Sequence, residues 1–204
     1  SVQEVMDLAG VAHLAAIRAR IPFLHFFDGF RTSHELAKVE VMDMDALTAL
    51  LDTDALAAFR ARALNPEHPH IRGTVQNGDV YFQAREASSR FYDALPDIVE
   101  KYMADIARIT GREYHLFDYC GAPDAEDIIV AMGSVSGVIR DTVDHLNAQG
   151  RKVGFIQVHL FRPFSCRHLL DAVPATVRRI AVLDRCREMG AAGEPLYQDV
   201  CTAF

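Results

Sequence analysis

The sequence predicts an α/β protein. From residue 114 onward, apolar runs of strand length alternate with longer helical stretches. Before that point the patterns are mostly helical, around one strand-like run at 21–27. Because strand–helix–strand order favours βαβ units, we expect a small doubly wound parallel-sheet domain over 113–204. Residues 1–112 should form a separate part that precedes it.

The first expected elements are a helix over 2–20 and a buried strand over 21–27. Glu4 lies near the start of the helix and Arg18 near its end, as the helix dipole favours. Its apolar residues are not confined to one face, so we expect neighbours on more than one side. The run at 21–27 is almost continuously apolar, with Pro22 near its start, where a missing N–H matters least.

Helices with one irregular segment should fill the middle of the chain. We expect helices at 43–51, 53–64, 88–95 and 97–110. Two prolines, two glycines and Asn77-Gly78 predict a looping segment over 65–85 with one turn. Asp97 is the expected N-cap of the last helix and Gly111 its stop.

The final part should hold four strands and three helices. The expected strands are 114–119, 127–132, 153–160 and 179–184. The expected helices are 134–149, 165–173 and one that begins near Glu194. A single strand cannot form a sheet, so the strand at 21–27 suggests that residues 1–112 are a piece of something larger.

Composition limits the classes of function. Of 204 residues, 50% are hydrophobic, and the mean hydropathy is +0.04, as in a soluble globular protein. No apolar run reaches the roughly 18 residues that span a bilayer, and no signal peptide is evident. The formal charge of −7 and the lack of a long basic cluster argue against nucleic-acid binding. The 4 cysteines lack metal or cluster spacing, so we expect reduced thiols and a cytoplasmic location.

Candidate binding residues follow the ends of expected strands, where ligands bind in parallel α/β sheets. In "MGSVSG", Gly133 allows a tight turn, and Ser134 and Ser136 can cap the next helix. The exposed N–H groups of this turn could hold an anion, or it is simply a capped strand–helix turn. Arg162 in "HLFRPFS" could bind a carboxylate or phosphate, although a pair with an acid at a domain interface is favoured.

The third strand end opens a loop, "DRCREMGAAGEPLYQD". Pro195 is well placed in the first turn of a helix, and the glycines indicate close approach of another backbone or a mobile loop. Elsewhere, His68 and His70 have no clustered partners, so no metal site is predicted. His34-Glu35 lacks a second histidine, and no Gly-x-Ser-x-Gly elbow is present.

The stretch "HFFDGFRTSHE" places polar groups directly behind the apolar run. Asp28, Arg31, Thr32 and Ser33 could form an anion or carboxylate site, or a network that holds a corner against another domain. Thr32 or Ser33 could cap a short helix whose first turn contains Glu35. Arg31 and Thr32 are the best candidates for reaching toward an active cleft.

Several stretches together resemble the pyruvate:ferredoxin (flavodoxin) oxidoreductases. They are "QEVMDLAGVAHLAAIRARIPFLHFFDGFRTSHE", "NPEHPHIRGTVQN", "YFQAREA", "YHLFDYCGAPDAEDIIVAMGS", "LFRPFS" and "IAVLDRCREMGAAGEPLYQDV". They occur in order over essentially all 204 residues. The resemblance implies that residues 1–112 are the later part of a thiamine-site domain plus linker. It also implies that 113–204 is similar to the C-terminal domain of transketolases.

The resemblance also implies an activity. Such enzymes oxidatively decarboxylate pyruvate on thiamine diphosphate with Mg²⁺, form acetyl-CoA, and pass electrons through [4Fe-4S] clusters to ferredoxin or flavodoxin. They are cytoplasmic homodimers, so the expected partners are the remaining domains and a second copy. No membrane or nucleic acid is expected as a partner.

The sequence departs from the family pattern mainly in what it lacks. The diphosphate-and-Mg²⁺ motif and the cluster cysteines are absent, and the family's pyruvate and thiamine contacts belong to segments ahead of Ser1. No catalytic residue is therefore assigned, and the isolated chain is expected to be inactive and to hold no cofactor. Cys186, Arg187 and Met189 alter one family loop slightly. The alternatives are a separate small subunit of a split 2-oxoacid oxidoreductase and a non-catalytic nucleotide-binding module.

Overall fold

The computed structural model describes residues 1–30, 32–34, 36–71, 73 and 75–204. These residues form two compact units, each built from separate parts of the chain. The first unit comprises Ser1–Val5, Phe26–Glu40 and Tyr114–Phe204. The second comprises Met6–His25 and Val41–Glu113.

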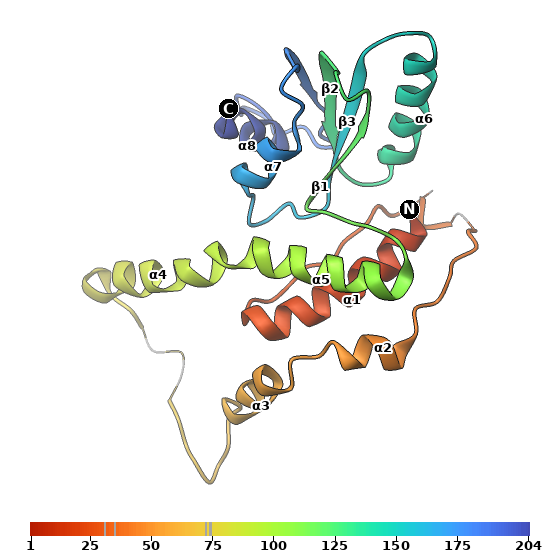
Figure 1. Ribbon diagram of the computed structural model, residues 1–204. Helices are drawn as coiled ribbons and strands as arrows, with labels where there is room; N and C mark the ends of the chain where they lie inside the picture. The colour runs from red at the N-terminus through yellow and green to blue at the C-terminus, as the bar shows by residue number, and fades with distance from the viewer. Residues whose placement is uncertain (31, 35, 72, 74) are drawn as a thin grey trace. The chain divides into compact units, whose positions relative to one another are not determined.

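The first unit contains a four-stranded sheet in the order β1-β3-β2-β4 (Figure 1). Its strands are β1 (Phe117–Gly121), β2 (Asp127–Ala131), β3 (Val153–Val158) and β4 (Arg179–Val182). Strand β3 is parallel to β2, with Val130 opposite Ile156, and β4 is parallel to β2 on its other side. The four strands that the sequence predicts over 113–204 are therefore present, with boundaries shifted by a few residues.

The sheet is mixed and not wholly parallel, which corrects the prediction. Strand β1 lies at the edge and pairs antiparallel with β3, Tyr119 opposite Ile156. Only residues 122–126 connect β1 to β2. A parallel crossover needs about a dozen residues, so this short connection makes the chain reverse its direction.

Helices cover both faces of this sheet, as expected for a doubly wound arrangement. Figure 1 shows α6 (Val135–Ala148) on one side and α7 (Cys166–Ala172) with α8 (Pro195–Ala203) on the other. The core under α6 contains Phe155 of β3, which is fully buried and packs with Ile139 and Val143. Burial of these apolar side chains is the main stabilising contribution in this unit.

The second unit is helical. It contains most of α1 (Val2–Ala19), together with α2 (Met44–Ala49), α3 (Thr53–Ala61), α4 (Gly78–Asp93) and α5 (Leu95–Thr110). One face of α5 is buried and includes Val99, Met103 and Ile106. Gly10 of α1 permits close packing, because a Cβ there would lie 3.2 Å from Leu47 Cδ1.

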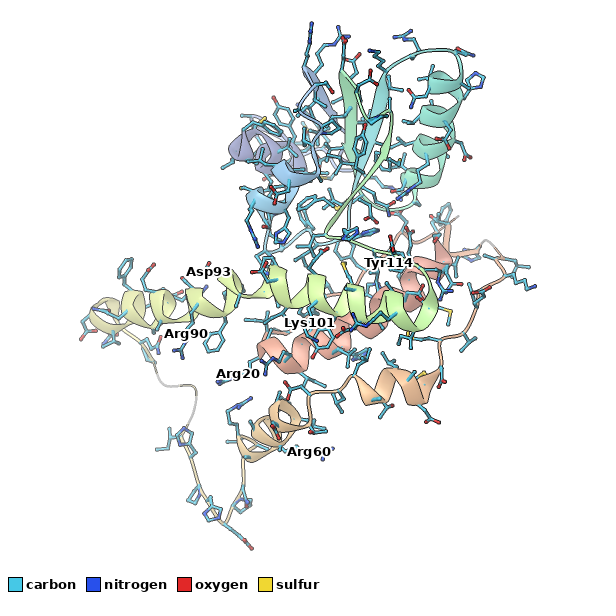
Figure 2. All side chains as sticks on the ribbon, in the orientation of Figure 1. Arg20, Arg60, Arg90, Asp93, Lys101 and Tyr114 are labelled. Carbon is cyan, nitrogen blue, oxygen red and sulfur yellow. The ribbon has the colours of Figure 1, made fainter. Side chains whose placement is uncertain are left out.

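Lys101, labelled in Figure 2, pairs with the buried Asp105 on the same helix (2.7 Å).

Three local predictions are wrong. Residues 21–27, of which 21–25 belong to this unit, form no strand, although their composition favours one. Helix α4 begins at Gly78, with Asn77 at its N-cap, so the predicted loop ends earlier and Asn77-Gly78 is no hairpin turn. Helix α5 starts after Ala94 and not at Asp97, because Pro96 suits its first turn. Gly111 does stop α5, in the left-handed conformation with φ 72°.

Candidate functional site

The carboxyl end of β2 meets the polar stretch behind residue 27 within the first unit. The Ser134 N–H donates to Asp28 Oδ2 at 2.9 Å. Arg185, just beyond β4, pairs its guanidinium with Asp28 Oδ1 at 2.8 Å. One carboxylate thus joins two strand-end loops that are far apart in sequence. We call Asp28, Ser134 and Arg185 the Asp28 junction.

Gly133 is suited to this junction for two reasons. Its φ of +83° lies in the left-handed region, which disfavours residues with a Cβ. A Cβ at this position would also lie 3.3 Å from Asp28 Oδ2. Gly133 therefore provides the tight turn that the sequence predicts and the space for the carboxylate.

Electrostatics favour the ionised form of Asp28. Hydrogen bonds from the Ser134 side chain and backbone lower the pKa of this carboxyl group, and Arg185 lowers it further. The carboxylate also lies against the N-terminal end of α6, where negative charge is favoured. The Asp28 carboxylate already accepts the hydrogen bond from the Ser134 N–H. The turn is therefore a poor site for an external anion.

The other predicted residues have local partners. The Thr32 hydroxyl donates to the Gly29 carbonyl oxygen (3.1 Å), and the Ser33 hydroxyl donates to Phe30 (2.8 Å). Both lie in a single 3-10 turn, η1 (Thr32–His34), and act as donors to carbonyl groups instead of accepting from N–H groups. Arg31 and Glu35 lie outside the described residues.

Arg162 pairs with an acidic residue, as the sequence predicts. This residue belongs to the same unit and not to a domain interface. Its guanidinium binds the carboxylate of Asp199 in α8 and also donates to the Phe161 carbonyl oxygen at 3.0 Å. It also stacks on the Phe161 ring, with 4.0 Å from Cζ to the centroid. Arg162 therefore has partners on α8 and in its own loop, and none of these belongs to the Asp28 junction.

Asp184, at the end of β4, has a structural role that the sequence analysis missed. Its two carboxylate oxygens accept from the backbone N–H groups of Leu196 (3.1 Å) and Tyr197 (3.0 Å). These amides lie in the first turn of α8, where helix N–H groups lack intrahelical partners. The signal in the sequence was an acidic residue at a strand end ahead of a helix that begins with proline.

The loop between Asp184 and α8 encloses a shallow cleft of about 450 Å³. Arg187 closes one side through its ion pair with Glu194 (2.9 Å). Gly193 is needed because a Cβ there would lie 2.3 Å from Tyr197 Cδ1. The close approach at Gly193 is thus to the aromatic ring of Tyr197 in α8, and not to another backbone as the sequence suggests.

A buried polar network near the end of β3 was also missed. Gln157, within an otherwise apolar strand, accepts from Arg140 (2.8 Å) and donates to Glu4 (3.1 Å). His159 lies beside it, with Nε2 2.9 Å from the Gln157 amide nitrogen and Nδ1 3.3 Å from Asp118 Oδ2. Burial raises the pKa of Asp118. A polar residue inside the run "VGFIQV" was the available sequence signal.

Metal-binding groups are not gathered in the described part of the chain. Among those residues, no three His, Cys, Asp or Glu side chains are placed to hold a metal ion together. All four cysteines are described and free, with Cys120 partly buried. Within the described residues, no helix is both long and apolar enough to cross a bilayer.

Two substitutions at Asp28 should distinguish the contribution of its Ser134 hydrogen bond to stability from that of its Arg185 ion pair. Asp28→Ala removes both contacts and should cost about 1 kcal/mol, because the pair is partly exposed. Asp28→Asn keeps an acceptor for the Ser134 amide, so its cost should be only about a few tenths of a kcal/mol. Hydrogen exchange of residues 26–40 would measure the difference, and equal exchange in both variants and the parent would contradict it.

The Asp28 contribution should also depend on pH. Its pKa is lower in the folded state than the ordinary value of 3.8. The stabilisation is therefore complete above about pH 4 and is lost as the pH falls through the folded-state pKa. The exchange difference between Asp28→Ala and the parent should shrink in acid, and a difference that grew would contradict this sign.

Removal of the Asp184 carboxylate should destabilise α8 locally. Asp184→Ala leaves two N–H groups of its first turn without their acceptor and should cost about 1–2 kcal/mol. Asp184→Asn should retain most of the stability. The denaturation midpoint and the exchange rates of α8 amides would test this, with Asp171→Ala on the exposed side of α7 as the control.

The fold and site define an α/β protein whose polar groups gather at the carboxyl ends of sheet strands. Residues 1–104 match the family model described as pyruvate flavodoxin/ferredoxin oxidoreductase, thiamine diphosphate-binding. Residues 125–204 match the model for pyruvate:ferredoxin oxidoreductase core domain II. The chain belongs to the pyruvate flavodoxin/ferredoxin oxidoreductase family.

Relatives support this assignment along the whole chain. A pyruvate-flavodoxin oxidoreductase of Enterobacter agglomerans is 62% identical over all 204 residues, and so is a pyruvate:ferredoxin oxidoreductase of Moorella thermoacetica. The chain spans 17% of the length of each. A solved 2-oxoglutarate:ferredoxin oxidoreductase from Magnetococcus marinus aligns with 58% of this chain and 20% of its own at 22% identity. Its TM-score of 0.35 is too low to bear on the fold.

Proposed function

We propose that this chain is part of an enzyme that oxidatively decarboxylates pyruvate to acetyl-CoA and CO₂. Electrons would pass to ferredoxin or flavodoxin. The supporting observation is 62% identity over all 204 residues to proteins described as pyruvate oxidoreductases with these acceptors. Because the chain spans only 17% of their length, we assign it a role as scaffold and as a domain or dimer interface.

We further propose two domain segments within the chain. Residues 1–112 would be the C-terminal part of a thiamine-site domain plus a linker, and residues 113–204 a domain like the C-terminal domain of transketolases. The order of the two family matches, 1–104 and then 125–204, supports this division. The mixed sheet with helices on both faces is compatible with the second assignment.

Thiamine diphosphate, Mg²⁺ and [4Fe-4S] clusters would belong to the whole enzyme. We assign none of these groups to this chain, because the described residues gather no three metal ligands and the Ser134 amide already binds Asp28. No step through these cofactors is assigned to this chain. The whole enzyme would be a cytoplasmic homodimer that takes pyruvate and coenzyme A.

The proposal is tested by anaerobic dye reduction with the full-length protein. Reduction should require both pyruvate and coenzyme A, and the 204-residue chain alone should give none. A full-length protein that used another 2-oxoacid and left pyruvate untouched would overturn the assignment. In the same assay, Arg31→Ala should lower turnover or weaken the dimer, and unchanged kinetics and assembly would remove Arg31 from the proposed interface.

A further inference from the structure

Residues 21–27 combine the composition of an inner strand with an unpaired backbone. The run "IPFLHFF" has apolar side chains on both faces of an extended chain, which is typical of a parallel strand covered by helices on both sides. In the described part of the chain these residues lie in no strand and carry no sheet arrow (Figure 1).

Most side chains of this run are open to solvent, while Ile21 and Phe23 are half-buried. Leu24 is 84% exposed, Phe26 59% and Phe27 61%. Within the described residues, no backbone hydrogen bond joins this run to any other segment. Each residue of the run except Pro22 therefore offers an N–H and a C=O group for pairing.

Such a segment is unfavourable if it stays uncovered. Short apolar runs with low charge and an unpaired backbone are templates for pairing with other chains, and proteins normally cover them. Arg20 (φ 61°) has a left-handed conformation directly between α1 and the run, and Phe30 (φ 55°) has one between the run and η1. The run is thus a distinct segment that follows a helix directly, as strands do in an α/β unit.

The rest of the polypeptide supplies a suitable occupant. This inference rests on the proposed function, in which the chain is one part of a longer polypeptide, since it spans 17% of the length of the relatives it matches. A short connection from α1 into the run is typical of a parallel sheet, in which a neighbouring strand belongs to the same polypeptide. A second copy would have to pair with the same segment across a symmetry axis, which gives antiparallel pairing and no helix cover.

We propose that residues 21–27 are an inner strand of a sheet whose other strands come from the remainder of the same polypeptide. Leu24 and Phe26 lie on one face of this strand and Phe23 and Phe27 on the other. Each face packs under apolar cover that lies outside these 204 residues. The strand that the sequence predicts at 21–27 would then form in the full-length protein, whereas these 204 residues form none there.

Hydrogen exchange in the full-length protein tests this directly. Peptides covering Phe23–Phe27 should exchange roughly a hundredfold or more slowly than an unstructured chain, as inner strands do. Exchange at the unstructured rate would overturn the proposal. Protection that disappears on dilution to the monomer would identify a second copy as the partner and would also overturn it.

Substitutions in the full-length protein provide an independent readout. Leu24→Pro removes an N–H that an inner strand needs, and Phe26→Asp places a charge under apolar cover. Both should greatly reduce the yield of assembled protein, whereas the matched variant Leu24→Ile should assemble with parental protection. If Leu24→Pro assembles and retains protection of its neighbouring amides, the run is no inner strand.

Discussion

Replacing Arg112 with alanine is expected to lower the free energy of unfolding by about 3–5 kcal/mol. The Asp7 side chain is fully buried, and both its oxygens bind the Arg112 guanidinium, at 2.6 Å from Nε and 3.0 Å from Nη2. The pair joins α1 to the residues just after α5, within the second unit. Loss of the guanidinium leaves a buried carboxylate without its charged partner, which is among the costliest changes in a protein interior.

Chemical denaturation of the 204-residue chain would measure this loss. Arg60→Ala is the matched control, since Arg60 is exposed on α3 (Figure 2) and should change stability by less than about 0.5 kcal/mol. The double variant Asp7→Leu/Arg112→Met should recover much of the stability, because it removes both charges together. A single Arg112→Ala variant as stable as the control would show that water or another group compensates Asp7.

The second large effect is expected at Phe155. Phe155→Ala should cost about 3–5 kcal/mol, because the ring is fully buried in β3 and its removal leaves a cavity between the sheet and α6. Phe59→Ala on α3 is the matched control, since Phe59 is 61% exposed and should lose less than about 0.5 kcal/mol. Equal losses for the two variants would mean that the core under α6 contributes little to stability.

The elements most accurately predicted are those whose pattern is local. Strands β2 and β3 are short apolar runs bounded by polar residues, and α6 follows a turn with glycine and serines. The stop of α5 at Gly111 needs only the conformational freedom of glycine. Such features depend on residues within one turn or one strand, so the sequence is sufficient to locate them.

The candidate site was predicted in its parts and not in its connections. Asp28, Gly133 and Ser134 were each identified behind an expected strand, yet Arg185 was not placed with them. Asp28 and Ser134 are 106 residues apart, and no periodicity encodes a contact of that separation. The same holds for the Asp184 carboxylate on the first turn of α8 and for Gln157 between Arg140 and Glu4.

The sequence by itself determined the α/β class, most helices and strands, and the family to which the chain belongs. These follow from local periodicity, from turn chemistry and from stretches whose order is specific. The tertiary structure alone decided the antiparallel pairing of β1, the burial of Asp7 against Arg112, and the partners of Asp28. The physical reason is that pairing and burial depend on which distant segments meet, and that depends on the free energy of the whole packed chain.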